Sequence, residues 1–363
     1  MLQIVGTGTF LFALARVAQW AVPVWWLPWV YGAIWFAGVL LAVLARPGLG
    51  GLAVWPSGGW NWVGAAVSAS LLGLGAWFGG QALMGRAAPP VPVVDISNPF
   101  GSGHFLVASG GSHPIVNAHM RTLDDSVERF RPWRGQSYAV DFFGLGPWGL
   151  RAQGWRPSDP AAYAIFGAPL VAPCSGTVVA VENAMPDFDV PQEDPVNRLG
   201  NHVILRCGDA EIVLAHMRQG SVTVAPGDRV ADGDPLGQVG NSGASTEPHL
   251  HIHAQRPAAE GAPPISGEPL GLRIDGRFLV RGGPAERPRG MSSASYRPFA
   301  FLAATILWTW AFWLGLAVSG LEAWENPGRW LVYAGGIGPL VMGLWFQHHH
   351  SGARGGFVTF GSA

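Results

Sequence analysis

The chain has 363 residues, of which 49% are hydrophobic and only 12% are charged, about half the charged fraction of an ordinary soluble protein. Its formal net charge is −1, so no global charge excess indicates a nucleic-acid partner. All 22 basic residues are arginine. The absence of lysine excludes Schiff-base chemistry, P-loop phosphate binding and carriers that attach biotin or lipoate to a lysine.

Apolar residues are concentrated at both ends of the chain. Of the 18 Trp residues, nine lie at or before Trp77 and six at or after Trp308, and Trp gathers at membrane interfaces. A helix needs about 20 mostly apolar residues to cross a bilayer. Stretches of about this length lie at 24–45, 61–84, 299–320 and 330–346, with a weaker one at 2–22.

These stretches predict a chain anchored in the lipid bilayer at both ends. We expect two or three transmembrane helices within residues 1–85 and two within 298–347, followed by a polar tail at 348–363. Arginines near the predicted membrane ends would place the middle region in the cytoplasm by the positive-inside rule. That rule loses force for loops longer than about 60 residues, so the orientation stays open at this level.

The middle of the chain has the pattern of an all-β domain. Pro- and Gly-rich stretches bracket it and predict linkers at 86–109 and 281–297, with the domain at 110–280. Between them, short apolar runs such as those at 169–183 and 201–217 alternate with turn-forming residues, as in antiparallel β structure. The only two cysteines, Cys174 and Cys207, could form a disulfide or remain buried thiols.

Three histidines alternate with aliphatic residues in the segment HLHIH. His249, His251 and His253 are separated by Leu250 and Ile252. On a β-strand, a period of two places the three imidazoles on one face and the aliphatic side chains on the other. Neutral imidazoles are zinc ligands, so this strand is the strongest candidate for a metal site.

The sequence around this strand resembles a known family of peptidases. The run GNSGASTEPHLH at 240–251 resembles the signature GNSGxSTGPHLH of the lysostaphin/LytM-type zinc endopeptidases (peptidase family M23). The segments PLVAPCSGTVV at 169–179, GNHVIL at 200–205, LAHM at 214–217 and SYAVDFFG at 137–144 resemble further family segments in the same order. The resemblance covers about residues 110–256 and implies the antiparallel β-sandwich of the duplicated-hybrid-motif type.

The resemblance also implies roles for individual residues. His251 and Asp141 match zinc ligands, and His216 and His249 match the two catalytic histidines. The family's remaining ligand is a histidine four residues before the aspartate, but Ser137 occupies that position. The missing ligand must therefore come from elsewhere or be absent.

Several upstream residues could supply the missing ligand. The candidates are His104, His113 and His119, with Gln136 as a weaker oxygen ligand. We favour His119, because a branch of the family has an N-x-H segment before the strand of the aspartate, and Asn117–His119 has this form. A loop of some 20 residues can return to the metal at modest entropic cost.

The implied activity is a zinc-dependent endopeptidase that uses metal-activated water and one Zn²⁺ ion. The expected substrates are stem or bridge peptides of peptidoglycan, which lie outside the cytoplasm, so the domain is expected to be extracytoplasmic. A degenerate family member that binds cell wall or regulates another hydrolase is the main alternative, and Ser137 favours it. A sugar-phosphotransferase module is disfavoured by the histidine and aspartate set.

Overall fold

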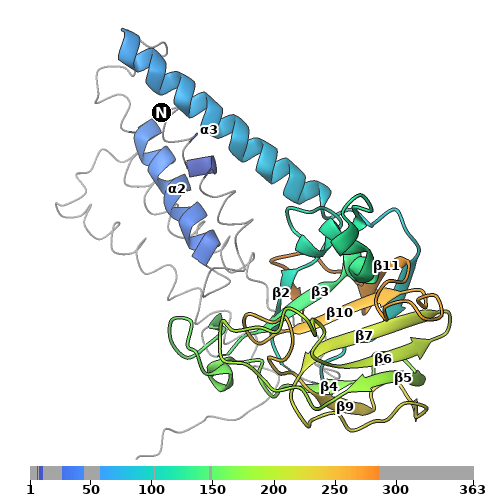
Figure 1. The fold of residues 1–363 in the computed structure, drawn as a ribbon. Helices are drawn as coiled ribbons and strands as arrows, with labels where there is room; N and C mark the ends of the chain where they lie inside the picture. Colours follow the sequence, from blue (N-terminus) through green and yellow to red (C-terminus); the bar gives the residue numbers. More distant parts are fainter. Residues whose placement is uncertain are drawn as a thin grey trace, which may run out of the picture. The chain divides into compact units, whose positions relative to one another are not determined.

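Apolar helices precede a β domain in the computed structural model, which describes residues 6, 8–10, 27–44, 58–101, 103–146 and 149–285. Helix α2 spans Leu27–Leu44 and helix α3 spans Gly59–Met84 (Figure 1). Helix α3 contains no proline and no charged residue, so nothing in it interrupts the helical hydrogen bonds. Many of its large side chains, including Trp60, Trp62 and Leu83, are exposed.

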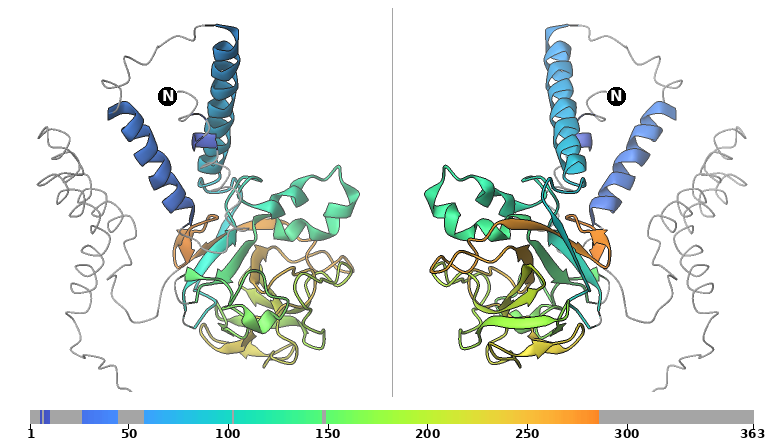
Figure 2. Two further views of the ribbon diagram at one scale, coloured as in Figure 1. Left: turned by 90° about the vertical axis from the view of Figure 1, so that its left-hand side faces the viewer. Right: turned by 90° about the vertical axis from the view of Figure 1, so that its right-hand side faces the viewer.

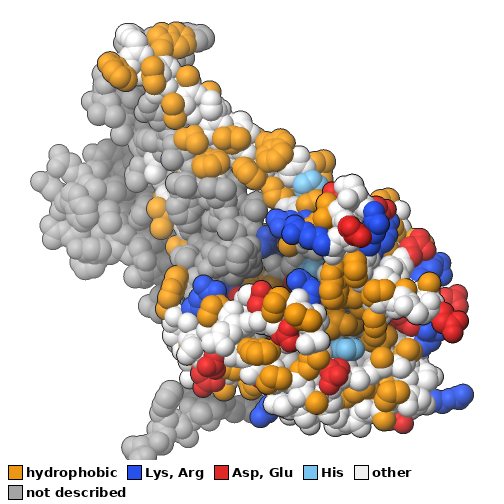
Figure 3. Space-filling view, in the orientation of Figure 1, with side chains coloured by type: hydrophobic (Ala, Val, Ile, Leu, Met, Phe, Trp, Pro, Cys, Tyr) orange, Lys and Arg blue, Asp and Glu red, His pale blue; other side chains and the backbone are white. Residues whose placement is uncertain are grey.

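The described part of the chain supports one membrane span where the sequence predicts several. Among the described residues, only α3 is long and apolar enough to cross a membrane, and Figure 3 shows hydrophobic side chains along its length. The predicted spans at 299–320 and 330–346 lie outside the described residues. An apolar composition indicates that a segment is shielded from water, but either lipid or other protein segments can shield it. With one suitable helix among the described residues, the prediction of several membrane spans is not supported.

The β domain contains an 11-stranded sheet and a separate two-stranded sheet. The main sheet is mostly antiparallel and runs in the order β13-β2-β3-β10-β7-β6-β5-β8, while β11 pairs with β10, β12 and, in parallel, β1. The second sheet pairs β4 with β9. The strands are β1 Val93–Ile96, β2 Phe105–Ser109, β3 Val140–Gly144, β4 Pro169–Val171, β5 Gly176–Glu182, β6 Asn201–Cys207, β7 Ala210–Met217, β8 Arg229–Val230, β9 Pro235–Gln238, β10 Leu250–Gln255, β11 Pro269–Ile274, β12 Arg277–Phe278 and β13 Pro284–Ala285.

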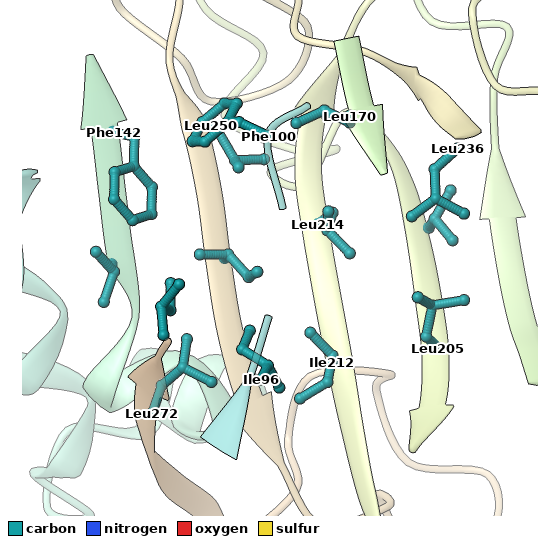
Figure 4. Packing of buried hydrophobic residues seen from close by; sticks show 14 of the residues in the cluster. Ile96, Phe100, Phe142, Leu170, Leu205, Ile212, Leu214, Leu236, Leu250 and Leu272 are labelled. Atoms are coloured by element: carbon teal, nitrogen blue, oxygen red, sulfur yellow. The ribbon is translucent and has the colours of Figure 1, made fainter. Parts of the chain in front are cut away.

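The all-β prediction is confirmed for this domain, but its two layers are very unequal. The main sheet curls around the core, and the short β4–β9 pair covers part of its inner face (Figures 1 and 2). Leu170 of β4 and Leu236 of β9 pack with Leu214 and Leu250 of the main sheet in one buried cluster (Figure 4). Leu, Ile and Phe side chains in this cluster are at most a few per cent exposed, so apolar burial holds the strands in register.

Two predicted linkers contain strands instead. Strands β1 and β2 lie within the stretch 86–109, and β13 lies within 281–297. All five residues of β2 are buried, so this strand lacks the polar–apolar alternation that marks a half-exposed strand in a sequence. The proline and glycine residues around these strands correctly indicated turns. The short strands between the turns were not predicted.

The two cysteines form a disulfide in the structure, which excludes the alternative of two buried thiols. Cys174 and Cys207 form a disulfide with a Cα–Cα distance of 6.2 Å, within the usual range. The bond connects the turn before β5 to the end of β6, two strands that are already paired. It therefore reinforces one edge of the main sheet.

Among the described residues, the domain also contains three 3₁₀ segments with defined bounds. They are η3 Ala118–Leu123, η4 Glu128–Tyr138 and η6 Pro160–Ala162. Segments η3 and η4 pack against each other, and η4 also contacts β10 and β11 (Figure 1). Segment η4 lies on the face of β10 opposite the apolar core.

Candidate metal and catalytic centre

The register of three neighbouring strands brings the candidate residues together. In the ladder of β3 and β10, Asp141 lies opposite His251, and in the ladder of β10 and β7, His251 lies opposite Ala215. Paired residues present their side chains on the same face of a sheet. Leu250 and Ile252 of β10 belong to the apolar core, so His251 faces the other side together with Asp141, as the alternation predicts.

A β-bulge aims His216 at the same face. Between β6 and β7, the single residue His202 is matched by two residues, Ala215 and His216. A bulge re-aims the side chain that follows it and is common beside active sites. His216 has φ of 60°, a left-handed conformation that is unusual outside glycine. Its backbone N–H donates to Leu199 O at 3.0 Å, which helps to hold this conformation.

His119 reaches the site from η3, outside the sheet. The side chain of Asn117 caps this segment, with its Oδ1 accepting from His119 N at 3.1 Å and lying 3.1 Å from His119 Nδ1. An amide oxygen only accepts hydrogen bonds, so Nδ1 of His119 carries the proton and Nε2 keeps a lone pair. That Nε2 lies 3.5 Å from Asp141 Oδ2.

His119, Asp141 and His251 form a group that fits a metal ion. Their ligand atoms all lie within 4.8 Å of one another, and His251 Nδ1 is 3.0 Å from Asp141 Oδ1. Two ligand atoms on a tetrahedral zinc ion, each bonded at about 2.0–2.2 Å, are separated by about 3.3–3.6 Å. The 3.0 and 3.5 Å separations from Asp141 approach this value, and the two histidine ligand atoms lie no more than 4.8 Å apart, so side-chain adjustment would bring all three to zinc-binding distance.

His249 and His216 lie beside this group with their Nδ1 atoms occupied. His249 Nδ1 lies 2.9 Å from Glu247 O, and His216 Nδ1 lies 2.9 Å from Ser242 O. Because carbonyl oxygens only accept, both Nδ1 atoms carry protons. The two rings are 4.6 Å apart, and His249 Nε2 lies 4.0 Å from Asp141 Oδ1.

The loop before β10 is fixed by an ion pair that the sequence analysis did not identify. Arg151 donates to Glu247 at 2.9 Å, and its guanidinium lies over the Phe143 ring at 4.5 Å. Ser245 Oγ donates to Glu247 O and lies 3.0 Å from His249 Nδ1. The motif contained Ser245 and Glu247, but nothing in the sequence indicated Arg151 as their partner.

Burial sets the protonation states that a metal site requires. It lowers the pKa of His119 to about 4, against the opposing effect of Asp141, and it lowers the pKa of His216 well below its ordinary value. Burial alone would raise the pKa of Asp141, but His119 and the hydrogen bond with His251 lead the contributions that hold it below its usual range. Neutral imidazoles and an ionised carboxylate at neutral pH are the forms that bind metal.

Ser137, which occupies the family's ligand position, is fully buried and has another role. Its Oγ donates to Arg134 O at 2.6 Å and lies 2.8 Å from Thr122 Oγ1, which donates to His119 O. Ser137 therefore connects η4 to the segment that carries His119. His104 and His113, the other histidine candidates, do not belong to the metal-binding group.

A known family of peptidases matches part of the β domain. Residues 160–263 match the model of peptidase family M23. The matched segment contains His216, His249 and His251, whereas His119 and Asp141 precede it. A search of curated proteins finds no match for this chain.

Solved structures with similarity to this chain include several peptidases. The catalytic domain of a prophage-encoded M23 protein from Enterococcus faecalis is 22% identical, with 34% of this chain and 71% of that chain covered and a TM-score of 0.23. The catalytic domain of the antimicrobial peptidase lysostaphin from Staphylococcus simulans is 24% identical, with 34% and 69% covered and a TM-score of 0.22. A zinc-containing peptidase from Vibrio cholerae is 17% identical, with 40% and 48% covered and a TM-score of 0.20. The family match therefore shows that residues 160–263 of the β domain are similar to peptidase family M23.

Proposed function

We propose that this chain is a zinc-dependent endopeptidase acting on the stem or bridge peptides of peptidoglycan. The observation that carries the proposal is the convergence of His119, Asp141 and His251 within metal-binding distance, with the rings of His216 and His249 beside them. The substrate class is supported by the M23 match and by the motif at 240–251. Two imidazoles and one carboxylate leave a tetrahedral position open, as in catalytic zinc sites.

Zinc in this site would polarise the scissile carbonyl and make an attacking water more acidic. Three side chains would hold it: His119 through Nε2, His251 through Nδ1, and Asp141 through a carboxylate oxygen. The hydrogen bond with Asn117 presents the Nε2 lone pair of His119 in advance. This preorganisation reduces the entropy lost when the metal binds.

His249 and His216 would handle protons beside the reacting bond. Each has its Nδ1 hydrogen bonded to a backbone carbonyl, which leaves Nε2 as the atom that can accept a proton. One ring can take a proton from the attacking water at Nε2 and later return it to the leaving amine. Once protonated, either ring can donate a hydrogen bond to the negative charge that develops on the carbonyl oxygen.

We also propose that α3 anchors the domain to a membrane with the domain outside the cytoplasm. Helix α3 is apolar and mostly exposed, and the disulfide of Cys174 and Cys207 indicates an oxidising compartment. An alkaline phosphatase fused after Arg86, active only when exported, is expected to be active. Activity from a cytoplasm-only reporter at that position, without phosphatase activity, would contradict this placement.

Digestion of purified cell-wall sacculi tests the proposed activity. The full-length chain, purified in detergent, is expected to release new amino groups from sacculi, to lose this activity with a zinc chelator and to regain it with added zinc. Asp141→Ala is expected to be inactive and His104→Ala to match the parent. If the parent binds zinc and sacculi but cleaves no peptide bond, the binding or regulatory alternative replaces this proposal.

A further inference from the structure

The third histidine of β10 has no assigned role, although it contacts a proposed zinc ligand. His253 is fully buried, and its Nδ1 lies 2.9 Å from Nε2 of His251. The other nitrogen of His251, Nδ1, faces Asp141. Both nitrogens of His251 are therefore engaged, one toward the metal site and one toward His253.

This pair of contacts determines where the protons lie when metal is bound. A neutral imidazole carries one N–H, so a His251 that offers its Nδ1 lone pair to the metal must carry its proton on Nε2. That proton can only be donated to His253 Nδ1, which must then accept. His253 in turn must carry its own proton on Nε2.

Packing alone does not account for an imidazole at position 253. Its Nε2 is buried and has no hydrogen-bond partner among the described residues, so the contact with His251 is the one hydrogen bond that the structure gives this ring. His253 lies opposite Val213 of β7, which is fully buried in a small apolar cluster with Ile204 and Ile265. An apolar residue would fill this place without a buried unsatisfied nitrogen.

We propose that His253 is a positioning residue for the metal site. It accepts a hydrogen bond from Nε2–H of His251, and thereby fixes the ring and the tautomer that present the Nδ1 lone pair to zinc. Outer partners of this kind orient metal-ligating histidines and increase their basicity. The inference rests on the proposed zinc site, but it requires no particular substrate.

Zinc affinity of the full-length chain, measured by chelator competition in detergent, tests the role of His253. His253→Leu removes the acceptor and is expected to weaken zinc binding by about 10- to 100-fold. His253→Asn can place a carbonyl oxygen near the position of Nδ1 and is expected to keep affinity within about threefold of the parent. Gln255→Leu is the matched control, because Gln255 is buried on the same face of β10 but bonds to Glu211 and Pro264. It is expected to leave zinc affinity unchanged.

Nitrogen-15 spectra of the histidine rings in the zinc-loaded parent give a measurement that needs no variant. We expect His253 to be unprotonated at Nδ1 and protonated at Nε2. Parent-like affinity in His253→Leu, a loss that His253→Asn fails to restore, or a protonated Nδ1 of His253 would each overturn the inference. A parent chain that binds no zinc would instead overturn the proposed function, and this inference with it.

Discussion

The two halves of the proposed metal site are built by different means. Asp141 and His251 lie on paired strands, where the backbone ladder fixes their separation. His119 lies on a 3₁₀ segment and is positioned by side chains, mainly Asn117. A backbone ladder thus fixes one pair of candidate ligands, whereas side-chain contacts fix the third. This difference also indicates that the half held by side chains is the more easily disturbed.

The side chain of Asn117 connects the loop half to the sheet half. It is fully buried, donates to Gly111 O and Ala139 O, and accepts from His119. Ala139 immediately precedes β3, the strand of Asp141. One amide therefore positions His119 relative to the strand that supplies the carboxylate. The four positions below are ordered by the expected effect of their substitution on zinc affinity.

The largest effect is expected from the sheet half. His251→Ala removes the ligand nearest Asp141 and is expected to weaken zinc binding by at least about 100-fold, more than about 2.7 kcal/mol. Because His251 points away from the apolar core, the fold is expected to persist, which circular dichroism can check. The zinc content of purified His251→Ala can be measured by elemental mass spectrometry. One zinc ion per chain in this variant would show that His251 is not a ligand.

His119→Ala tests the loop half. We expect zinc affinity to fall by at least about tenfold and hydrolysis of sacculi to be abolished, because two protein ligands hold zinc much less tightly than three. His104→Ala and His113→Ala are matched controls from the same upstream region and are expected to behave as the parent does. A His119→Ala chain that binds zinc and cleaves normally would show that another residue supplies the third ligand.

Two variants of Asn117 test its effect on the position of His119 separately from its effect on the stability of the domain. Asn117→Ala leaves buried Gly111 O and Ala139 O without their donor, so we expect a loss of about 2–4 kcal/mol in unfolding free energy, together with a few-fold loss of zinc affinity. Asn117→Asp retains an acceptor for His119 Nδ1 but cannot donate. It is expected to lose stability in urea titrations while keeping more zinc affinity than the alanine variant. Equal zinc affinities for the two variants would argue against tautomer control by Asn117.

The smallest effect on zinc is expected at His249. Its nitrogen lies beside the ligand group but is not needed to hold the metal, so His249→Ala should keep zinc affinity within about threefold. Hydrolysis is nevertheless expected to fall by at least about 100-fold, because proton transfer at Nε2 is lost. Loss of zinc from His249→Ala with retention in His251→Ala would reverse the two assigned roles.

The sequence predicted the strand-borne part of the site better than the rest. A period of two placed His251 and His253 on one face of β10, and the motifs identified Asp141 and His216. The motif could not show the bulge at Ala215–His216, because an extra residue in one strand is visible only against its partner. Strands β1 and β2 were assigned to a linker, since short, fully buried strands lack the alternation that identifies a strand.

His119 was favoured because of the N-x-H segment that a branch of the family carries, and its environment was not predictable. The N-x-H spacing indicated a candidate, but the cap by Asn117 and the contact of Ser137 with Thr122 depend on the packing of η3 against η4. Arg151 lies 96 residues from Glu247, and no local pattern relates them. Contacts between side chains on irregular segments depend on the complete fold, whereas the contacts of ladder partners follow from register.

Zinc K-edge X-ray absorption of the full-length chain tests most directly whether His119 completes the metal site. With zinc at saturation, the parent is expected to show two imidazole ligands and a carboxylate, and His119→Ala is expected to show one imidazole. His104→Ala and His113→Ala should keep the parent spectrum. Two imidazoles in His119→Ala, with an unchanged spectrum, would show that another residue supplies the ligand and would contradict this account.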